Sequence, residues 1–479
     1  MANLPPRTFY LIALGGTAMA PLAGLLVERG DRVLGSDLPL YPPMSDRIAA
    51  LGIEVLPGFS AENLPKGIDH VVVGNLAGKD NPELVEALRR GLPVSSMPET
   101  LHDEFLLGRH PVVVTGTHGK TTTTALAAWV LASAGLEPGY LVGGEPVNFP
   151  APSAIGQGPA FVVEGDEYST SWRDKGPKFL HYAPRTLILT SVEFDHADLY
   201  ADLAAVTEVF RRGVGLVPPE GLVVACGDDP GVLAVLSSSR ARAVIYRVEP
   251  GVGEEEGIVA RGLAFGPEGT TFEVVENGTP LFLASLPLSG RHNVANALAA
   301  VAVGRAFGLG ASALAKGLAT FRGVQRRLEV KGTEGGVTVV DDFAHHPTAV
   351  GETIRGARGR FPGRRLWAVF EPRSITGGRA DFAPAYRTAL AGADAVALAH
   401  PFHARRLAVS GTGALDTARL AEELTQAGVE AFTAPGAEAI VDQLSGQLRD
   451  GDVVLVMSSG SFGGLCGKLL ERLRPAPLG

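Results

Sequence analysis

The sequence predicts an α/β protein of three domains, with parallel sheets throughout. Short apolar runs rich in β-branched residues alternate with helical patterns along almost the whole chain, which is typical of parallel strands joined by helices. The length of 479 residues is that of about three domains. The pattern is interrupted at residues 107–110 and 321–324, so we expect domains at 1–107, 108–322 and 323–479.

The first domain is expected to be a nucleotide-binding βαβ unit. A strand at residues 9–14 precedes the turn 15–17 and a helix that ends near Arg29, and a second strand at 32–35 leads to Ser36 and Asp37. An acidic residue about twenty positions after the loop suits a sugar hydroxyl. The loop does not match G-x-G-x-x-G, so a Rossmann-like turn that binds nothing is the alternative.

The second domain opens with the most informative stretch of the chain, residues 111–135. An apolar strand ends in a glycine loop, and an alanine-rich helix follows directly. Gly116 and Gly119 allow a tight turn that presents N–H groups to phosphate oxygens at a helix N-terminus. Lys120 would neutralise the β- and γ-phosphates, and the Thr121 hydroxyl would bind Mg²⁺. Val114 stands where the general P-loop has its first glycine, so this is a shorter form of that loop.

Acidic residues follow two later strands of the same domain. The strand at 160–163 leads to Glu164, and the strand at 186–190 leads to Asp195 and His196. Ligands bind at the carboxyl ends of parallel strands, so Thr121, Glu164 and His196 form a plausible magnesium set. The alternative is a helix cap for Asp195 and a core hydrogen bond for His196.

The third domain is expected to carry strands at 338–340, 366–370, 395–399 and 453–456. Arg373 and Ser374 follow one of these strands, and an arginine there suits a carboxylate; the alternative is a surface residue that caps the loop. His345 and His346 could orient an amine or take its proton, or they could simply shape the turn before Pro347. A substrate-lining or surface loop is the expectation for His400 and His403, which have metal-like spacing but no third ligand nearby.

Composition limits the class of protein. Hydrophobic residues make up 46% and charged residues 19%, and the net charge of −9 argues against nucleic acid as the main partner. Cys226 and Cys466 have no metal-ligand spacing and are expected to be reduced. The apolar run near the N-terminus is too short for a signal peptide or membrane span, so we expect a cytoplasmic protein with no membrane partner.

Six motifs in this order resemble those of the Mur ligases, which build the peptide of bacterial cell walls. They are GT-x-GKT at 116–121, the acidic strand end at Glu164, D-H-x-D at 195–198, H-N-x-x-N at 292–296, the pair Arg326-Arg327, and D-D-x-x-H-H-P at 341–347. The resemblance covers nearly the whole chain. It implies a Rossmann-like UDP-sugar domain, a central P-loop ATPase domain and a C-terminal Rossmann-like domain, with ATP and Mg²⁺ as cofactors.

The resemblance also implies roles for particular residues. The expected catalytic residues are Lys120, Glu164, His196, Arg327 and His345. The expected ATP contacts are Gly116, Thr117, His118, Gly119, Lys120, Thr121, Thr122, His292, Asn293, Asn296, Arg327 and Asp342. The expected substrate contacts are Gly16, Thr17, Met19, Ser36, Asp37, Asn75, Asn148, Arg373, Ser374, Ser459 and Ser461.

Within that family, four segments look like the branch that recycles cell-wall peptides. They lie at 142–149, 167–189, 370–374 and 457–464. That branch joins UDP-N-acetylmuramate to the tripeptide L-alanyl-γ-D-glutamyl-meso-diaminopimelate or a similar peptide. The alternatives are the ligase that adds the first L-alanine and a catalytically silent Mur-like regulator. The sequence leaves open whether the protein is a monomer or a homodimer.

Two departures from the family pattern stand out. Ala13 replaces the first glycine of the opening loop, and Ala18 replaces a glycine of some relatives, both in the loop that the resemblance assigns to the pyrophosphate. Some Mur ligases hold a second metal through a carbamylated lysine, but here Arg211 stands at the expected position. The sequence therefore predicts the lysine-free metal arrangement.

Overall fold

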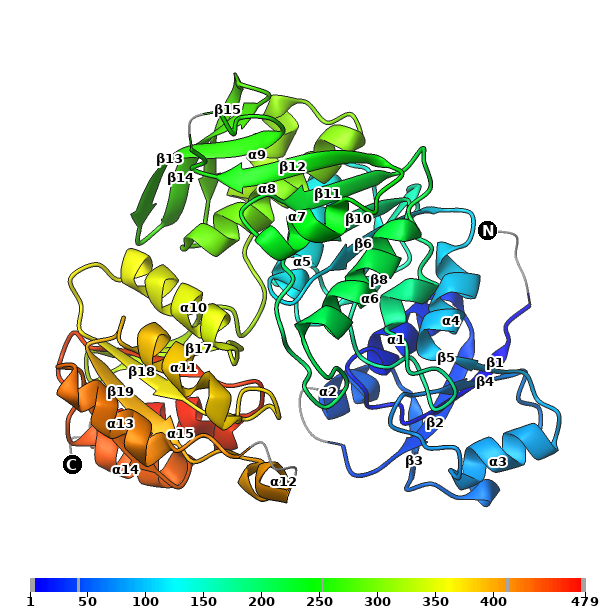
Figure 1. Cartoon of the computed structure of the whole chain (residues 1–479). Coiled ribbons are helices and arrows are strands. Elements are labelled where there is room, and N and C mark those ends of the chain that lie inside the picture. Colours follow the sequence, from blue (N-terminus) through cyan, green and yellow to red (C-terminus); the bar gives the residue numbers. More distant parts are fainter. Residues whose placement is uncertain (1–4, 41–43, 252, 410–412, 475–479) are drawn as a thin grey trace.

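Three sheets follow one another along the chain in the computed structural model, which describes residues 5–40, 44–251, 253–409 and 413–474. Figure 1 shows them as a blue N-terminal part, a cyan-to-green central part and a yellow-to-red C-terminal part. The three-domain α/β architecture expected from the sequence is confirmed. We propose that the domains divide at 107/108 and 322/323.

The N-terminal sheet has five parallel strands in the order β3-β2-β1-β4-β5. Its strands are β1 (Thr8–Ile12), β2 (Arg32–Asp37), β3 (Glu54–Pro57), β4 (His70–Val73) and β5 (Val94–Ser96). Its helices are α1 (Met19–Arg29), α2 (Met44–Ala50), α3 (Pro82–Arg89), α4 (Met97–Leu101) and the turns η1 (Ala61–Asn63) and η2 (His102–Leu106). Ile12 pairs with Ser36, so the loop after β1 and Asp37 lie at one edge of the sheet.

The central sheet has ten strands in the order β15-β14-β13-β12-β11-β10-β6-β9-β7-β8. They are β6 (His110–Thr115), β7 (Gly139–Leu141), β8 (Ser153–Ala154), β9 (Ala160–Glu164), β10 (Thr186–Leu189), β11 (Leu222–Cys226), β12 (Arg242–Val248), β13 (Ile258–Gly266), β14 (Gly269–Glu276) and β15 (Thr279–Leu286). The helices are α5 (Lys120–Ser133), α6 (Leu203–Gly215), α7 (Pro230–Leu236), α8 (Arg291–Ala306), α9 (Ala311–Ala319) and η3 (Lys178–His181). Strands β6, β9 and β10 are parallel neighbours, so their carboxyl ends meet at one edge.

The expectation of parallel sheets throughout is wrong for parts of two sheets. Strands β13, β14 and β15 form an antiparallel meander, and β16 pairs antiparallel with β17. Asn277 and Gly278, with φ of 48° and 77°, make the turn between β14 and β15, and Gly335 and Gly336 make the turn between β16 and β17. Two-residue turns with both φ positive are the standard connection of an antiparallel hairpin. The pairs Asn277-Gly278 and Gly335-Gly336 could therefore have indicated these hairpins from the sequence.

The C-terminal sheet has six strands in the order β16-β17-β21-β18-β19-β20. They are β16 (Glu329–Glu334), β17 (Val337–Asp342), β18 (Leu366–Phe370), β19 (Ala395–Ala399), β20 (Glu430–Ala434) and β21 (Val453–Met457). The helices are α10 (Pro347–Arg360), α11 (Ala383–Leu390), α12 (Ala404–Val409), α13 (Thr417–Gln426), α14 (Ala437–Ser445), α15 (Leu465–Leu473), η4 (Ala380–Phe382) and η5 (Phe462–Gly464).

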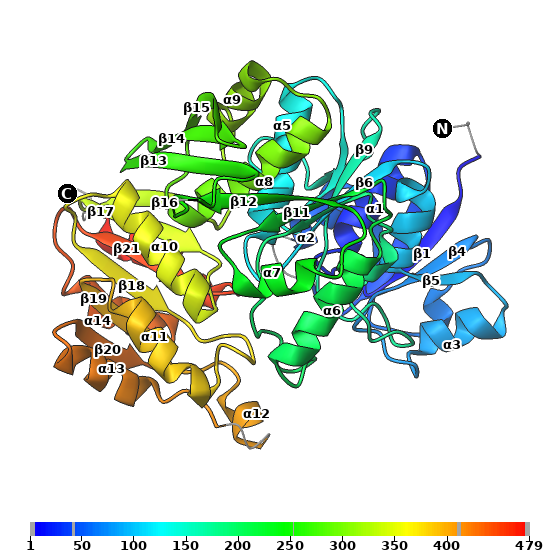
Figure 2. The same cartoon turned by 45° about the horizontal axis from the view of Figure 1, so that its top comes forward.

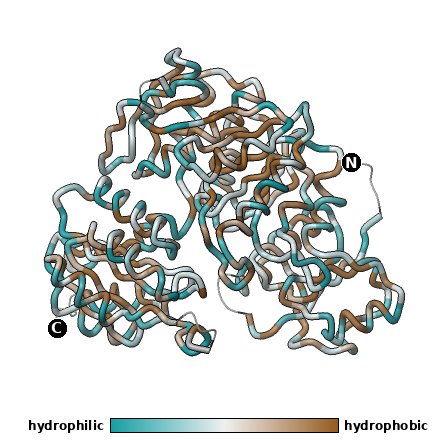
Figure 3. Tube along the Cα trace, viewed as in Figure 1, coloured by the Kyte–Doolittle hydropathy of each residue, from teal (hydrophilic) through white to brown (hydrophobic). Residues whose placement is uncertain are grey.

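The apolar cores show how the three parts are joined. Leu26 of α1 and Phe161 of β9 belong to one continuous apolar cluster, so the first two domains share a core. The C-terminal domain has separate clusters on the two faces of its sheet, with Phe370 on one face and Trp367 on the other. Figure 3 shows the apolar strands running through the interior of each part. Figure 2 shows α10 of the C-terminal domain lying toward the central domain.

Candidate active site

The glycine loop and the start of α5 form the centre of the site. Gly116 and Gly119 have φ of 130° and 78°, a region that favours glycine. A Cβ at Gly116 would lie 2.2 Å from Thr190 Oγ1, and one at Gly119 would lie 2.7 Å from Asn296 Oδ1. Neither position has room for a side chain. Helix α5 begins directly after this loop with Gly119 as its N-cap and no side-chain cap, and the N–H groups of such a helix start suit an anion.

Lys120, the first residue of α5, is buried in a network of oxygen atoms. Its Nζ donates to Gly116 O at 2.6 Å and forms an ion pair with Glu167 Oε2 at 2.7 Å. Burial opposes the charge on Lys120, but Glu167 and Asp166 outweigh it and raise the pKa of the ammonium. Sequence reasoning did not assign Glu167 a role, although its place in the acidic run 164–167 was a signal.

Thr121, Glu164 and Arg327 meet beside the loop. Thr121 Oγ1 donates to Glu164 Oε1 at 2.9 Å, and Gly143 N donates to the other carboxylate oxygen at 2.7 Å. Arg327 Nη2 donates to Thr121 Oγ1 at 3.3 Å. Burial raises the pKa of Glu164, and the charge of Lys120 opposes this shift. A hydroxyl and a carboxylate oxygen so close together are donors of the kind that Mg²⁺ prefers.

His196 lies on a strained turn at the edge of this group. Its φ is 54°, and its ring packs on Tyr168 with centroids 4.4 Å apart. Among the described residues, no hydrogen bond or ion pair joins His196 to Thr121 or Glu164, so its role as a ligand stays a prediction. Asp195 Oδ1 accepts from the backbone N–H of His196 at 2.7 Å. No described helix begins at Asp195, and the N-cap of α6 is Asp202, so the helix-cap alternative for Asp195 is wrong.

A second ion pair, Lys178 with Asp166, lies next to the metal candidates. Lys178 Nζ is 3.0 Å from Asp166 Oδ2. Burial opposes ionisation of Asp166, but Lys178 and Lys120 lower the pKa of this carboxyl. Arg211 is not part of this network among the described contacts, since it pairs with Glu208 at 2.6 Å on α6.

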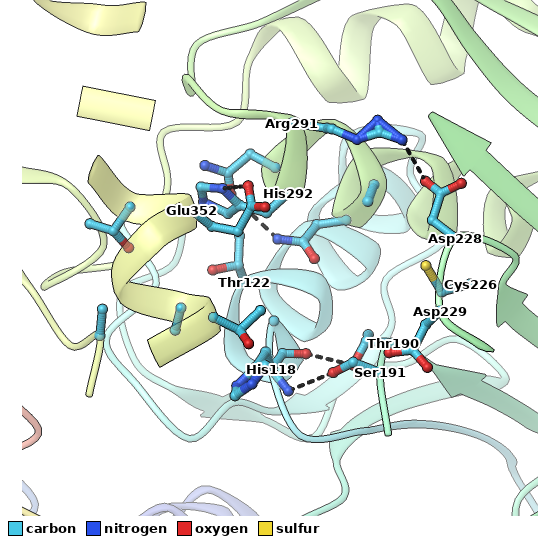
Figure 4. Close-up of a pocket in the computed structure, with 18 of the residues that line it drawn as sticks. His118, Thr122, Thr190, Ser191, Cys226, Asp228, Asp229, Arg291, His292 and Glu352 are labelled. Atoms are coloured by element: carbon cyan, nitrogen blue, oxygen red, sulfur yellow. Dashed lines mark hydrogen bonds and ion pairs between the residues drawn. The ribbon is translucent and has the colours of Figure 1, made fainter. Parts of the chain in front are cut away.

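A cavity opens between the glycine loop, α8 and the C-terminal domain (Figure 4). The residues expected at ATP that line it are His118, Gly119, Thr122, His292, Asn293, Asn296, Arg327 and Asp342. Thr123 Oγ1 donates to Asn296 Oδ1 at 3.0 Å, which ties α5 to α8. Asp342 uses both carboxylate oxygens locally, because it accepts from Leu328 N and Ala344 N, each at 2.8 Å.

The C-terminal domain closes this cavity with residues that sequence reasoning missed. Glu352 of α10 lies 3.7 Å from His292 Nδ1, and Thr348 Oγ1 donates to Glu193 Oε2 at 2.7 Å. These residues had no motif around them, because only the packing of α10 against the central domain brings them to the cavity. Cys226 also lines the cavity, and burial raises the pKa of its thiol to about 11.

Comparison with known proteins places this arrangement in a family. Three family models match in order: Mur ligase family, catalytic domain, at 8–106; Mur ligase middle domain at 114–304; and Mur ligase, glutamate ligase domain, at 326–460. The chain is 37% identical, over 97% of its length and 98% of the relative, to the UDP-N-acetylmuramate–L-alanyl-γ-D-glutamyl-meso-2,6-diaminoheptandioate ligase of Escherichia coli (strain K12).

The chain belongs to the Mur ligase family. It is an ATP-dependent ligase that forms a C–N bond. Among its relatives is also a UDP-N-acetylmuramate–L-alanine ligase from Salinibacter ruber, which is 37% identical over 95% of this chain and 93% of the relative. A solved murein peptide ligase from Psychrobacter arcticus is 30% identical with a TM-score of 0.71, and the match covers 98% of this chain and 99% of that one.

In this Mur ligase, Arg373 is held in a defined position at the end of β18. Its guanidinium lies 4.0 Å above the Phe402 ring, and Nη1 is 3.5 Å from Glu371 Oε1. A Cβ at Gly460 would lie 2.0 Å from Arg373 Nε, so the glycine leaves the space that the guanidinium occupies. Ser458 Oγ donates to Glu371 Oε2 at 2.5 Å. These contacts fix the guanidinium in place, and its binding of a substrate carboxylate, as opposed to capping its own loop, stays a prediction.

The other residues expected to bind the peptide differ in their exposure and in the contacts that they make. Ser374 Oγ accepts from Gly377 N at 2.8 Å, so it stabilises its own loop. Ser459 is half-buried, and Ser461 and His400 are exposed. His403 is half-buried, and burial lowers the pKa of its ring.

His345 and His346 take different positions. His345 Nε2 lies 3.8 Å from Asp195 Oδ2, and burial lowers the pKa of His345. His346 is the N-cap residue of α10, and its ring centroid lies 4.7 Å from that of His118. Burial lowers the pKa of His346 to about 4, so this imidazole is neutral near pH 7. One histidine therefore faces the loop of Asp195 and the other faces the glycine loop.

Only some of the residues expected to bind muramate lie close together in the structure. Asp37 Oδ2 accepts from Gly15 N at 2.6 Å, which ties it to the loop of Gly16 and Thr17. Ser36 is fully buried and donates to Glu83. Met19 is buried, whereas Thr17 and Asn75 are exposed.

Two further residues, Asn148 and Ala13, belong to the loops expected near UDP-N-acetylmuramate. Asn148 donates to Thr320 O at 2.9 Å and accepts from Arg322 N at 2.6 Å, so it links its loop to the end of the central domain. Ala13 has φ of 62°, a left-handed backbone that a residue with a side chain adopts only at a cost in strain. No described helix has the length and apolar character to cross a membrane.

Proposed function

We propose that this ligase joins the carboxylate of UDP-N-acetylmuramate to the α-amine of L-alanyl-γ-D-glutamyl-meso-diaminopimelate or a similar tripeptide, with ATP and Mg²⁺. The names of the Escherichia coli relative and of a 34% identical relative from Haemophilus influenzae support this assignment. Such a reaction serves peptidoglycan recycling.

One contact carries the proposal. Ala197 N donates to Thr376 Oγ1 at 2.9 Å, so the loop after β10 touches the loop after β18. The first loop carries His196, and the second carries Arg373. An amine held by the C-terminal domain would therefore meet a carboxylate activated at the central domain.

The chemistry follows from the groups at this junction. A carboxylate is a poor acyl donor, so the muramate carboxylate attacks the γ-phosphate of ATP, releasing ADP and leaving an acyl phosphate. The neutral amine then attacks the acyl carbon, and the tetrahedral intermediate expels phosphate. Lys120 contacts the carbonyl of Gly116 and Arg327 contacts the hydroxyl of Thr121, and both would stabilise the charge on the transferring group.

The buried network supplies what such a transfer needs. Thr121 and Glu164 would hold Mg²⁺, with His196 as a third ligand, and the ion would neutralise charge on the phosphate oxygens. Lys120 would exchange its ion pair with Glu167 for the phosphates. His345, neutral because burial lowers its pKa, could accept the proton of the amine.

The other two substrates, the UDP-sugar and the peptide, would be bound by separate sets of residues. The N-terminal loop residues Gly16, Thr17 and Met19, with Ser36, Asp37, Asn75 and Asn148, would bind the UDP-sugar. Arg373, Ser374, Ser459 and Ser461 would bind the peptide. A nucleotide-linked sugar and ATP as substrates support the cytoplasm as the location, and the protein acts as a monomer or homodimer.

Two competing functions predict different dependence of phosphate release on the substrates. The ligase needs ATP, Mg²⁺, UDP-N-acetylmuramate and the tripeptide, so omission of any one should abolish release. A catalytically silent regulator would release no phosphate from the complete mixture. The alanine-adding reaction, supported by the Salinibacter ruber relative, would need L-alanine in place of the tripeptide.

A further inference from the structure

We propose that His118, Glu193 and His346 form a binding site for a late first-row divalent cation, with Zn²⁺ as the best fit. His118 belongs to the glycine loop, Glu193 follows β10, and His346 begins α10. The cation would therefore connect the central domain to the C-terminal domain. This site is separate from the magnesium candidates Thr121, Glu164 and His196.

The three side chains already converge on one point. One ligand atom from each residue lies within 4.8 Å of the others. Glu193 Oε2 is 3.6 Å from His118 Nε2 and 3.6 Å from His346 Nδ1. Zinc-ligand distances of about 2.0–2.2 Å in tetrahedral geometry place ligand atoms roughly 3.2–3.6 Å apart. A small rearrangement of the side chains would satisfy that spacing.

The ring nitrogens that converge here are unpaired in the described part of the structure. His118 Nε2 and both nitrogens of His346 are buried without a hydrogen-bond partner among the described residues. His346 is only 5% exposed. Buried polar atoms in proteins are almost always paired, and an unpaired one costs about 1–3 kcal/mol. Coordination of a cation would supply the missing partner for His118 Nε2 and for one nitrogen of His346.

The surrounding contacts hold the ligands in place. Thr348 Oγ1 donates to Glu193 Oε2 at 2.7 Å, and Ser191 Oγ accepts from His118 N at 2.9 Å. Phe382 packs edge-on against the His346 ring, with centroids 5.4 Å apart. Such outer contacts orient the ligands of a metal site.

The donor set favours zinc over magnesium. Two imidazoles and one carboxylate are the ligands of a zinc site with one open position, whereas Mg²⁺ prefers oxygen ligands. Late first-row cations bind imidazole more tightly than earlier ones do. Magnesium at millimolar concentration would therefore fill the oxygen-rich site at Thr121 and Glu164 and leave the His-Glu-His site free.

The test is a titration of the full-length protein with Co²⁺ and Zn²⁺ in the presence of millimolar Mg²⁺. We expect one equivalent of Co²⁺ to bind with visible absorption typical of nitrogen and oxygen ligands, and Zn²⁺ to displace it. His346→Gln and Glu193→Gln should each weaken binding at least about tenfold. His345→Gln is the matched control, because its ring faces Asp195 instead, and it should bind as the parent does.

Three results would overturn the proposal. The first is a parent protein that takes up no Co²⁺ at micromolar concentration, which needs no variant and so does not depend on folding of a mutant. The second is equal affinity in the parent and in a folded His346→Gln protein. The third is a sulfur-to-cobalt charge-transfer band, which would place Cys226 in the site. None of these readouts depends on the ligase activity, so they stand apart from the proposed function.

Discussion

Arg327 and Thr121 are 206 residues apart in the sequence, yet Arg327 Nη2 donates to Thr121 Oγ1 across 3.3 Å. The linker to the third domain therefore reaches the first turn of the helix that starts at the glycine loop. Phe343 supports the guanidinium from one side, 5.1 Å from its ring centroid. The C-terminal domain thus brings a fixed cation to the place where phosphate would be transferred.

Arg327→Lys should lower kcat by about 10²–10³, since a single ammonium cannot reproduce the fork of a guanidinium at a charged transition state. Arg322→Ala is the control, because Arg322 is exposed on the same linker. Steady-state phosphate release measures both. Near-native turnover of a folded Arg327→Lys protein would exclude Arg327 from the transfer step.

Lys120→Ala should reduce turnover by at least about 10³, because the main phosphate-stabilising charge is lost. It should also destabilise the protein by roughly 3–5 kcal/mol, since Glu167 is left buried without its ion pair. The double variant Lys120→Ala/Glu167→Gln should recover much of that stability and none of the activity. Thermal unfolding and kinetics together separate the two effects, and recovery of ligation by the double variant would refute the assignment.

Glu164→Ala and His196→Ala should both weaken activity in a way that excess Mg²⁺ or Mn²⁺ partly relieves. Glu164 accepts a hydrogen bond from Thr121, whereas none of the described hydrogen bonds or ion pairs joins His196 to either residue, so the shift in metal requirement should be larger for Glu164→Ala. Activity measured against metal concentration tests this. Titration curves identical to that of the parent would rule out direct coordination by that residue.

Glu352→Gln should destabilise the protein by about 1–3 kcal/mol at neutral pH. Burial opposes ionisation of Glu352, but His292 and Arg355 outweigh it and lower its pKa to about 2. A lowered carboxyl pKa stabilises the fold above the unfolded value near 4.5, and this stability is lost as the pH falls toward 2.

The difference in melting temperature between parent and Glu352→Gln should therefore be full at pH 7 and narrow below about pH 4.5. Glu430→Gln is the control, since Glu430 forms a half-exposed surface pair with Arg365. A melting-temperature difference that grows as the pH falls would contradict the predicted direction of the pH dependence.

Strands with strong local signals were predictable from the sequence. β18 and β19 lie at the residues expected, because each is a buried run of five apolar residues beside a helix. The glycine loop and α5 were equally clear, because a lysine and threonine at the start of a helix have few structural explanations. The antiparallel meander was missed, although Asn277-Gly278 marks it as a hairpin.

Side chains that meet only through tertiary packing were not predictable. Glu167 was visible as part of an acidic run, but its pairing with Lys120 depends on the approach of β9 to β6. Glu352 and Thr348 lie on a helix with no motif, and only the position of α10 gives them a place at the cavity. Patterns in sequence locate the loops of this site, and packing between domains decides which side chains share it.

The central claim is that the amine substrate is the tripeptide. A tripeptide with several carboxylates needs cationic contacts beyond those of a single amino acid, and Arg373 is held between Phe402 and Gly460 at the proposed groove. Binding energy from remote groups can place the amine for attack. Arg373→Ala should therefore cost about 2–4 kcal/mol of the preference for the tripeptide, the size expected when a bound carboxylate loses its charged partner.

The most direct measurement is the ratio of kcat/KM for L-alanyl-γ-D-glutamyl-meso-diaminopimelate to that for L-alanine, with UDP-N-acetylmuramate and ATP saturating. If the tripeptide is the amine substrate, the ratio is far above one for the parent protein and much smaller for Arg373→Ala. Comparable kcat/KM for the two amines in the parent would contradict this assignment and make the chain an alanine-adding ligase.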